Sequence, residues 1–118
     1  MLVILHGYGC NSNTNYVVQK LAAYDEDASL TVDYLLSLPT CNGRVGATGM
    51  CLGGHLAYRC ALDSRVKASV CYFATDIHSR TLALGKSDDS LARAGDIKGE
   101  MLMVCTNYCL IGICVVVC

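Results

Sequence analysis

A glycine-rich motif limits the possible folds of this chain more than any other stretch. Residues 49–53 read Gly-Met-Cys-Leu-Gly and lie between an apolar segment typical of a strand and a segment with helical periodicity. This is the pattern G-x-S-x-G with cysteine in place of serine, in which a nucleophile sits on a sharp, strained strand-to-helix turn. Gly49 and Gly53 remove side chains that would collide in such a turn, and Gly54 allows the helix to pack close to the sheet.

The motif makes Cys51 a candidate nucleophile. Its position at the end of a strand and the start of a helix exposes the sulfur to backbone N–H groups and to the helix dipole, which favour a thiolate. The backbone N–H of Leu52, the next residue, is placed to stabilise a developing oxyanion. A buried structural cysteine in a glycine-rich turn is the alternative interpretation, because cysteine is common in protein cores.

The composition indicates one small domain that is rich in apolar residues. Only 16% of the 118 residues are charged and 53% are hydrophobic, so the chain has more material for a core than for a shell. The net charge of −1 gives no indication of a nucleic-acid or anionic membrane partner. The nine cysteines are odd in number and irregularly spaced, which does not predict a disulfide framework. The first apolar run has no basic segment before it, so we expect no signal peptide, a cytoplasmic location and reduced thiols.

Strand and helix patterns alternate along the chain. Apolar runs predict strands at residues 2–5, 44–48, 66–74 and 100–104. Helices are expected at 24–38 and 52–62, with a short one at 90–94. Asp25, Glu26 and Asp27 are expected in the first turn of the first helix, where they suit its dipole better than they would form a metal site. The alternation predicts an α/β fold with a mainly parallel sheet flanked by helices.

The two ends of the chain leave alternatives open. His6 and Gly7 after the first strand fit either an oxyanion loop or an ordinary turn. Residues 105–118 are uncharged and contain four cysteines, so they fit an unpaired β segment, a membrane span or a metal site. The spacing C-x3-C-x4-C-x3-C differs from the paired zinc pattern, and no basic residue follows the segment. We favour the β segment and expect no membrane span, no metal and no cofactor.

Residues 49–55, Gly-Met-Cys-Leu-Gly-Gly-His, carry a family resemblance. The chain resembles the dienelactone hydrolases (carboxymethylenebutenolidases), particularly the fungal-type members, over about residues 24–104. Further similar stretches are residues 24–28, 38–43, 70–74 and 96–100. The resemblance implies a cysteine hydrolase that attacks a lactone or ester without metal or cofactor, with Cys51 as nucleophile and the Leu52 N–H as oxyanion donor. We expect residues 1–118 to form a single, incomplete domain with a partial α/β-hydrolase fold, truncated at both ends.

The resemblance also implies two catalytic partners that this chain does not carry. Family members have an aspartate after the strand that matches residues 100–104 and a histidine after the next strand. Here no Asp or Glu follows Glu100, and no His follows His78. His55, one helical turn after Cys51, and His78, in a polar loop, do not stand at the family's histidine position. The chain is therefore expected to be an impaired hydrolase; the alternatives are an inactive fragment that associates through its sheet edges and a thiol-redox protein.

Overall fold

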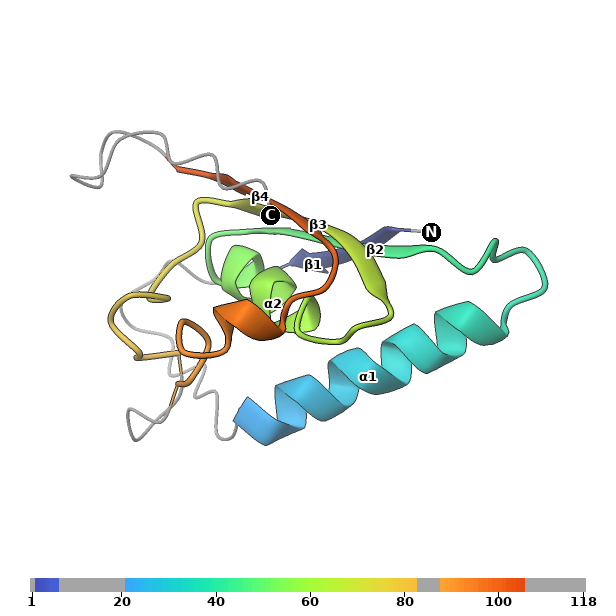
Figure 1. Cartoon of the computed structure of the whole chain (residues 1–118), viewed down its shortest axis with the longest axis horizontal. Coiled ribbons are helices and arrows are strands. Elements are labelled where there is room, and N and C mark those ends of the chain that lie inside the picture. Colours follow the sequence, from blue (N-terminus) through green and yellow to red (C-terminus); the bar gives the residue numbers. More distant parts are fainter. Residues whose placement is uncertain (1, 7–20, 83–87, 106–118) are drawn as a thin grey trace.

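The described part of the chain forms a four-stranded parallel sheet with helices. The structure, a computed structural model, describes residues 2–6, 21–82 and 88–105, without the side chains of 2–6 (Figure 1). The elements are β1 (Leu2–His6), α1 (Leu21–Ser37), β2 (Val45–Met50), α2 (Leu52–Cys60), β3 (Val66–Tyr72), the 3-10 helix η1 (Ala94–Asp96) and β4 (Glu100–Val104). All neighbouring strands are parallel, in the order β1-β2-β3-β4. The predicted α/β fold with a mainly parallel sheet is confirmed. Gly7 and residues 106–118, over which the sequence left alternatives open, lie outside the described residues.

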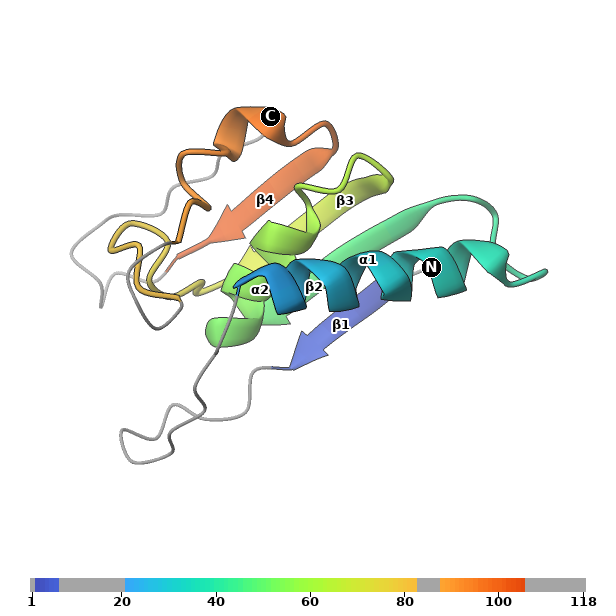
Figure 2. The same cartoon turned by 90° about the horizontal axis from the view of Figure 1, so that it is seen from below.

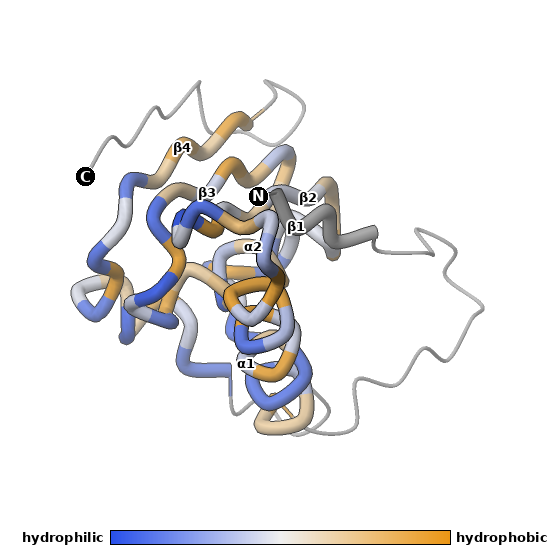
Figure 3. The backbone as a smooth tube through the Cα atoms, turned by 90° about the vertical axis from the view of Figure 1, so that its right-hand side faces the viewer, coloured by the Kyte–Doolittle hydropathy of each residue, from blue (hydrophilic) through white to orange (hydrophobic). Residues whose placement is uncertain are grey.

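Both helices lie on one face of the sheet. Figure 2 shows α1 and α2 lying across the strands, and Figure 3 shows the end-on view with the sheet on one side of them. In β2, Val45, Ala47 and Gly49 are buried toward the helices, which is the alternation expected for a strand with one covered face. The core consists of apolar side chains from both helices and from the covered face of the sheet, including Val32, Leu35, Ala57, Tyr58, Val66, Cys71 and Met101.

The opposite face of the sheet is open within the described residues. The strand register brings Met50 beside Tyr72, and Tyr72 beside Val104. The next row on this face ends at Leu102 of β4. Met50 is 59% exposed and Leu102 is 36% exposed, so large apolar side chains face outward here. Parallel sheets are usually covered on both faces, so this sheet has one apolar face without a covering layer in the described part of the chain.

Helix α1 begins earlier than predicted. Its first residue is Leu21, so the acidic residues 25–27 follow the first turn, which contains no acidic residue. The prediction that they occupy the first turn is wrong, because the Leu-Ala-Ala sequence at 21–23 extends the helix at its start. The buried side chains of α1 are Val32 and Leu35, which contribute to the core. The helix ends at Ser37, shortly before Pro39, as the sequence indicated.

The predicted short helix at residues 90–94 does not form. The backbone N–H of Ser90 instead donates to the Asp88 carboxylate at 2.9 Å, which closes a local turn. The 3-10 helix η1 follows at Ala94–Asp96. Smaller boundary differences have local causes as well: β3 ends at Tyr72, two residues before predicted, because Phe73 has a positive φ of 50° that a strand cannot accommodate.

Gly99, just before β4, generates the first testable prediction. A Cβ atom at this position would lie 2.5 Å from the carbonyl oxygen of Val66 and 2.8 Å from that of Lys67. Because both neighbours are backbone atoms of β3, they cannot move aside without disturbing the sheet. We expect Gly99→Ala to lower the free energy of unfolding by about 1–3 kcal/mol, measured by urea denaturation followed by circular dichroism.

Gly95→Ala is the matched control. Gly95 lies in η1, and nothing stands within 4 Å of a Cβ built on it. This variant should stay within about 0.5 kcal/mol of the parent. Equal stabilities of the two variants would contradict the close approach of Gly99 to β3.

Candidate active site

Cys51 lies on a sharp turn between β2 and α2, as the sequence predicted. It follows Met50, the last residue of β2, and precedes Leu52, the first residue of α2. Its backbone angles are φ 58° and ψ −121°, a conformation that residues with a side chain rarely adopt. Such a conformation costs about 1–3 kcal/mol and persists only where the surroundings impose it. The strained strand-to-helix turn expected of the glycine motif is therefore present.

Hydrogen bonds from two directions hold the Cys51 backbone. Its N–H donates to the carbonyl oxygen of Tyr72 at 2.9 Å. Its own carbonyl oxygen accepts from the N–H groups of Gly54 at 3.0 Å and His55 at 3.2 Å, both in the first turn of α2. A third donor, the N–H of Thr75, approaches the same oxygen at 3.4 Å from the segment after β3. The turn is thus fixed both by the helix that it starts and by the neighbouring strand.

Gly54, just after the motif, lies at a crowded point of the turn. A Cβ atom on Gly54 would stand 2.8 Å from the Tyr72 carbonyl oxygen and 3.1 Å from the Cα atom of Ala74. That oxygen is the acceptor for the Cys51 N–H, so a side chain at position 54 would displace a contact that holds the turn. Gly49, near the end of β2, and Gly53, in the first turn of α2, are both buried. The absence of a side chain at Gly54 is compatible with the close approach of α2 to the end of β3.

Strained backbone gathers at this edge of the sheet. Besides Cys51, the residues Phe73 (φ 50°) and Asp76 (φ 62°) have positive φ, and both follow the carboxyl end of β3. In α/β sheets, ligands bind outside the carboxyl ends of the strands, and strained residues concentrate at functional sites. Cys51 is half-buried rather than enclosed. The carboxyl ends of β2 and β3 therefore form the candidate active site.

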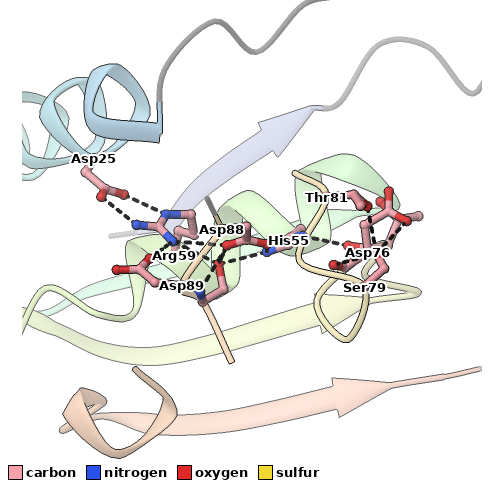
Figure 4. Close-up of polar contacts among 10 residues, drawn as sticks. Asp25, His55, Arg59, Asp76, Ser79, Thr81, Asp88 and Asp89 are labelled. Atoms are coloured by element: carbon pink, nitrogen blue, oxygen red, sulfur yellow. Dashed lines mark hydrogen bonds and ion pairs between the residues drawn. The ribbon is translucent and has the colours of Figure 1, made fainter. Parts of the chain in front are cut away.

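A buried polar cluster lies beneath the turn (Figure 4). We call His55, Arg59, Asp88 and Ser90 the His55 cluster; His55, Arg59 and Asp88 are labelled in Figure 4. The side chain of His55 is fully buried, with Nδ1 2.6 Å from the carbonyl oxygen of Thr75. Its Nε2 lies 2.9 Å from the Ser90 hydroxyl and 3.2 Å from the Asp88 carboxylate. Because a carbonyl oxygen only accepts, Nδ1 is the donor in the contact with Thr75.

The His55 cluster has more hydrogen-bond acceptors than the available protons can satisfy. The single Ser90 hydroxyl proton faces two acceptors, the carboxylate of Asp88 and Nε2 of His55. The second carboxylate oxygen of Asp88, the one nearest Nε2, is buried without a hydrogen-bond partner in the described part of the chain. A proton on Nε2 could be donated to the Ser90 hydroxyl oxygen or to the second Asp88 carboxylate oxygen, and the Ser90 proton would then be free for Asp88. Burial lowers the pKa of His55 and opposes that proton, whereas the Asp88 carboxylate acts in the opposite direction.

Arg59 connects this cluster to helix α1. Its side chain is 3% exposed, and its guanidinium donates two bonds to the Asp25 carboxylate, at 2.9 and 2.6 Å. It also donates to Asp89 at 2.8 Å and to the Ser90 hydroxyl at 2.9 Å. The two bonds that Arg59 donates to the Asp25 carboxylate raise the pKa of Arg59, and the guanidinium in turn lowers the pKa of Asp89. One buried cation therefore joins α1, α2 and the segment at 88–90.

Sequence reasoning treated His55 only as a possible base and did not foresee this cluster. A signal was available, because Cys51, His55 and Arg59 follow one another at intervals of four residues and so share one helix face. The other candidates stay apart from this arrangement: His78 is exposed, and the Asp76 carboxylate accepts from the nearby Ser79 hydroxyl at 3.4 Å. His6 ends β1 and pairs with Met50 in the strand register. The part of the chain that the structure describes contains no group of His, Cys, Asp and Glu placed to hold a metal ion.

Comparison with known proteins decides the family. A model described as "Dienelactone hydrolase family" matches residues 3–107. The chain belongs to the dienelactone hydrolase family. The match is wider than the range 24–104 over which the sequence showed its resemblance, and it includes residues 3–6 of β1.

Relatives of known name support the dienelactone hydrolase assignment. The chain is 50% identical over 101 residues to the Saccharomyces cerevisiae protein named "Putative carboxymethylenebutenolidase", covering 81% of this chain and 37% of that protein. It is 33% identical over 86 residues to the carboxymethylenebutenolidase of a Pseudomonas species, covering 64% of this chain and 36% of that protein. Carboxymethylenebutenolidase 1 of Cupriavidus pinatubonensis is 37% identical over 54 residues, which are 46% of this chain and 23% of that protein. The chain thus spans well under half the length of each relative.

No helix in residues 2–6, 21–82 and 88–105 is both long and apolar enough to cross a membrane.

The Arg59 contacts generate the second prediction. Asp25→Asn removes the charge that faces a nearly buried guanidinium, and it replaces one accepting oxygen by a donor. We expect this variant to lower the free energy of unfolding by about 1–2 kcal/mol, because hydrogen bonds to charged groups contribute more than neutral ones. Thermal and urea unfolding at neutral pH measure the change.

Asp33→Asn is its control on the same helix. Asp33 pairs with Arg65, but here both side chains are partly exposed, at 59% and 34%. Exposed ion pairs contribute little, so this variant should lose less than about 1 kcal/mol. A loss for Asp33→Asn as large as that for Asp25→Asn would contradict the importance of burial at Arg59.

Proposed function

We propose that this chain carries the nucleophile-bearing part of a hydrolase of dienelactone-hydrolase type, with Cys51 attacking the carbonyl carbon of a small lactone or ester. The strained backbone of Cys51, at the carboxyl end of a parallel strand and the start of a helix, carries this proposal. The family match and the names of the relatives support the substrate class. No metal or cofactor enters the proposed reaction. A cytoplasmic location belongs to the same proposal, supported by nine cysteines without disulfide-type spacing.

The proposed chemistry has two halves. In the first, the Cys51 thiolate forms a carbon–sulfur bond with the carbonyl carbon, and the π electrons of the carbonyl move onto its oxygen. The N–H of Leu52 is the proposed donor to this oxyanion, and none of the hydrogen bonds found in the described residues uses it. Collapse of the intermediate breaks the carbon–oxygen bond of the ester, and the leaving oxygen takes up a proton. A thioester on Cys51 remains.

The second half is the step in which we expect this chain to fail. Water must attack the thioester, release the carboxylic acid and return the thiol, and this step needs a general base. No Asp or Glu follows Glu100 and no His follows His78 in the sequence. His55 is unsuited to the task, because its ring is fully buried and Nδ1 donates to the Thr75 carbonyl oxygen. The proposed activity is acylation of Cys51 with very slow release.

The third prediction tests this proposal. An activated ester should give a burst of at most one equivalent of product per chain, and Cys51→Ala should abolish the burst. Steady turnover should be lower by about three orders of magnitude or more than in an intact cysteine hydrolase. Iodoacetamide followed by peptide mass spectrometry should label Cys51 first among the cysteines. Cys60 and Cys71 serve as internal controls, because burial raises the pKa of each thiol to about 11 and they should react slowly.

Three outcomes would contradict it. Steady ester turnover that Cys51→Ala abolishes would mean that a histidine of this chain acts as base after all. First labelling at Cys105, Cys109, Cys114 or Cys118 would mean that Cys51 is not the activated thiol. Rapid peroxide oxidation of Cys51 without any ester burst would favour the thiol-redox alternative.

A second candidate function rests on the open face of the sheet. Met50, Tyr72 and Leu102 are exposed on that face, and β1 and β4 are the edge strands of the described sheet. We propose that the chain self-associates through this face and these edges, as an inactive fragment would if the catalytic proposal fails.

The fourth prediction tests self-association. Leu102→Glu should shift the sedimentation distribution toward the monomer, because it places a charge on the apolar face at the edge strand β4. Leu30→Glu is the control, since Leu30 is also exposed, at 58%, but lies on α1 away from the sheet. A parent chain that sediments as a clean monomer would rule the proposal out.

A further inference from the structure

We infer that His55 is a positioning residue for the candidate nucleophile: its ring holds the segment after β3 against the Cys51 turn. The inference rests on the proposed role of Cys51 and adds a residue that acts on Cys51 through Thr75. The link is direct, because Nδ1 of His55 donates to the carbonyl oxygen of Thr75 at 2.6 Å. The N–H of the same Thr75 donates to the carbonyl oxygen of Cys51 at 3.4 Å.

These contacts form a closed ring. The backbone N–H of His55 donates to the Cys51 carbonyl oxygen at 3.2 Å, so His55 contacts the turn with its backbone and Thr75 with its side chain. Thr75 completes the ring by its own bond to Cys51. The bond from the Thr75 N–H to the Cys51 carbonyl oxygen is long, at 3.4 Å, whereas the bond from the His55 imidazole to the Thr75 carbonyl oxygen is short, at 2.6 Å. The imidazole is therefore the stronger of the two contacts that keep Thr75 at the turn.

The surroundings fix the imidazole in this orientation. The ring is fully buried and lies in the T-shaped arrangement with Tyr58, with centroids 6.4 Å apart. On its far side Nε2 faces the Ser90 hydroxyl and the Asp88 carboxylate, and Arg59 donates to that hydroxyl. Nδ1 carries its proton both in this neutral tautomer and in the imidazolium. The bond to Thr75 thus persists in either protonation state.

The backbone that this contact holds is strained on both sides. Cys51 has φ 58°, and in the segment after β3 the residues Phe73 and Asp76 also have positive φ. Strained residues keep their conformation only where several contacts impose it. Without the imidazole bond, the hydrogen bonds described here that still join this region to the turn include the long Thr75 bond and the bond from Cys51 to Tyr72, the last residue of β3. Relaxation of the turn would move the sulfur away from the helix N-terminus that favours its thiolate.

Two substitutions separate positioning from simple filling of space. In His55→Asn the amide nitrogen takes the place of Nδ1 and can still donate to Thr75. In His55→Gln the amide reaches toward the place of Nε2, near Ser90, and leaves the Thr75 oxygen without its donor. Glutamine is closer to histidine in volume than asparagine is. If His55 only fills space in the core, His55→Gln should preserve the reactivity of Cys51 better than His55→Asn. If His55 positions the turn, His55→Asn should preserve it better.

The fifth prediction uses the full chain and the rate of iodoacetamide labelling at Cys51, divided by the rate at Cys41 in the same molecule. Cys41 is half-buried in the loop after α1 and serves as an internal reference. The ratio should stay within about twofold of the parent in His55→Asn and fall by about tenfold or more in His55→Gln, since small displacements of a reacting group have large effects on rate. His78→Gln, on an exposed histidine, should leave the ratio unchanged.

Labelling of the buried Cys60 and Cys71 reports unfolding, so each variant is compared while these two remain protected. If His55→Gln does not fold while His55→Asn does, the order of the two variants still agrees with positioning and contradicts space filling. Equal ratios in both variants, or a lower ratio in a folded His55→Asn than in His55→Gln, would overturn the inference. An ester burst in the parent together with equal ratios would leave the proposed function standing and remove only the role of His55. If the ratios of the two variants differ but the parent gives no ester burst, the role of His55 stands and the proposed function is contradicted.

Discussion

The backbone of Cys51 is the constraint on which the candidate site depends. An L-residue at φ 58° is unfavourable by itself, and here four backbone hydrogen bonds, to Tyr72 and from Gly54, His55 and Thr75, keep it in place. Those partners come from α2, from the end of β3 and from the segment after it, so the turn forms only when α2 is packed on β3. The absence of a side chain at Gly54 makes that packing possible, because a Cβ there would meet the Tyr72 carbonyl oxygen at 2.8 Å. Local strain and tertiary packing are thus two aspects of the same arrangement.

The charges beneath the turn have a structural role and also limit the chemistry. Arg59 joins Asp25 of α1 to Asp89 and Ser90, while His55 connects Ser90 and Asp88 to the segment after β3. Such buried groups are tolerated because each charge has a partner, and removal of one partner would leave another unpaired. The arrangement withdraws His55 from solvent. The histidine nearest to Cys51 along the sequence is consequently a support of the turn and not a free base.

The sheet combines one well-packed face with one open face. Val45, Ala47 and Val66 pack beneath the helices, whereas Met50, Tyr72 and Leu102 face outward within the described residues. Parallel sheets usually bury both faces, which explains why an apolar surface remains here. The chain also spans only 37% of the length of its Saccharomyces cerevisiae relative. Within the described residues, the helices cover one face of the sheet and leave the other face open.

The sequence alone determined the features that depend on near neighbours. The glycines around Cys51 predicted the turn, and the alternation of apolar runs with helical periodicity predicted a mainly parallel sheet, because both signals lie within a few residues of the structure they produce. Helix ends and the segment at 90–94 were less predictable, since the Asp88–Ser90 turn replaced a local helical preference. Only the tertiary structure decided the role of His55. Its partners Thr75 and Ser90 lie 20 and 35 residues further along the chain, and such distant contacts exist only after β3 and the segment at 88–90 have packed against α2.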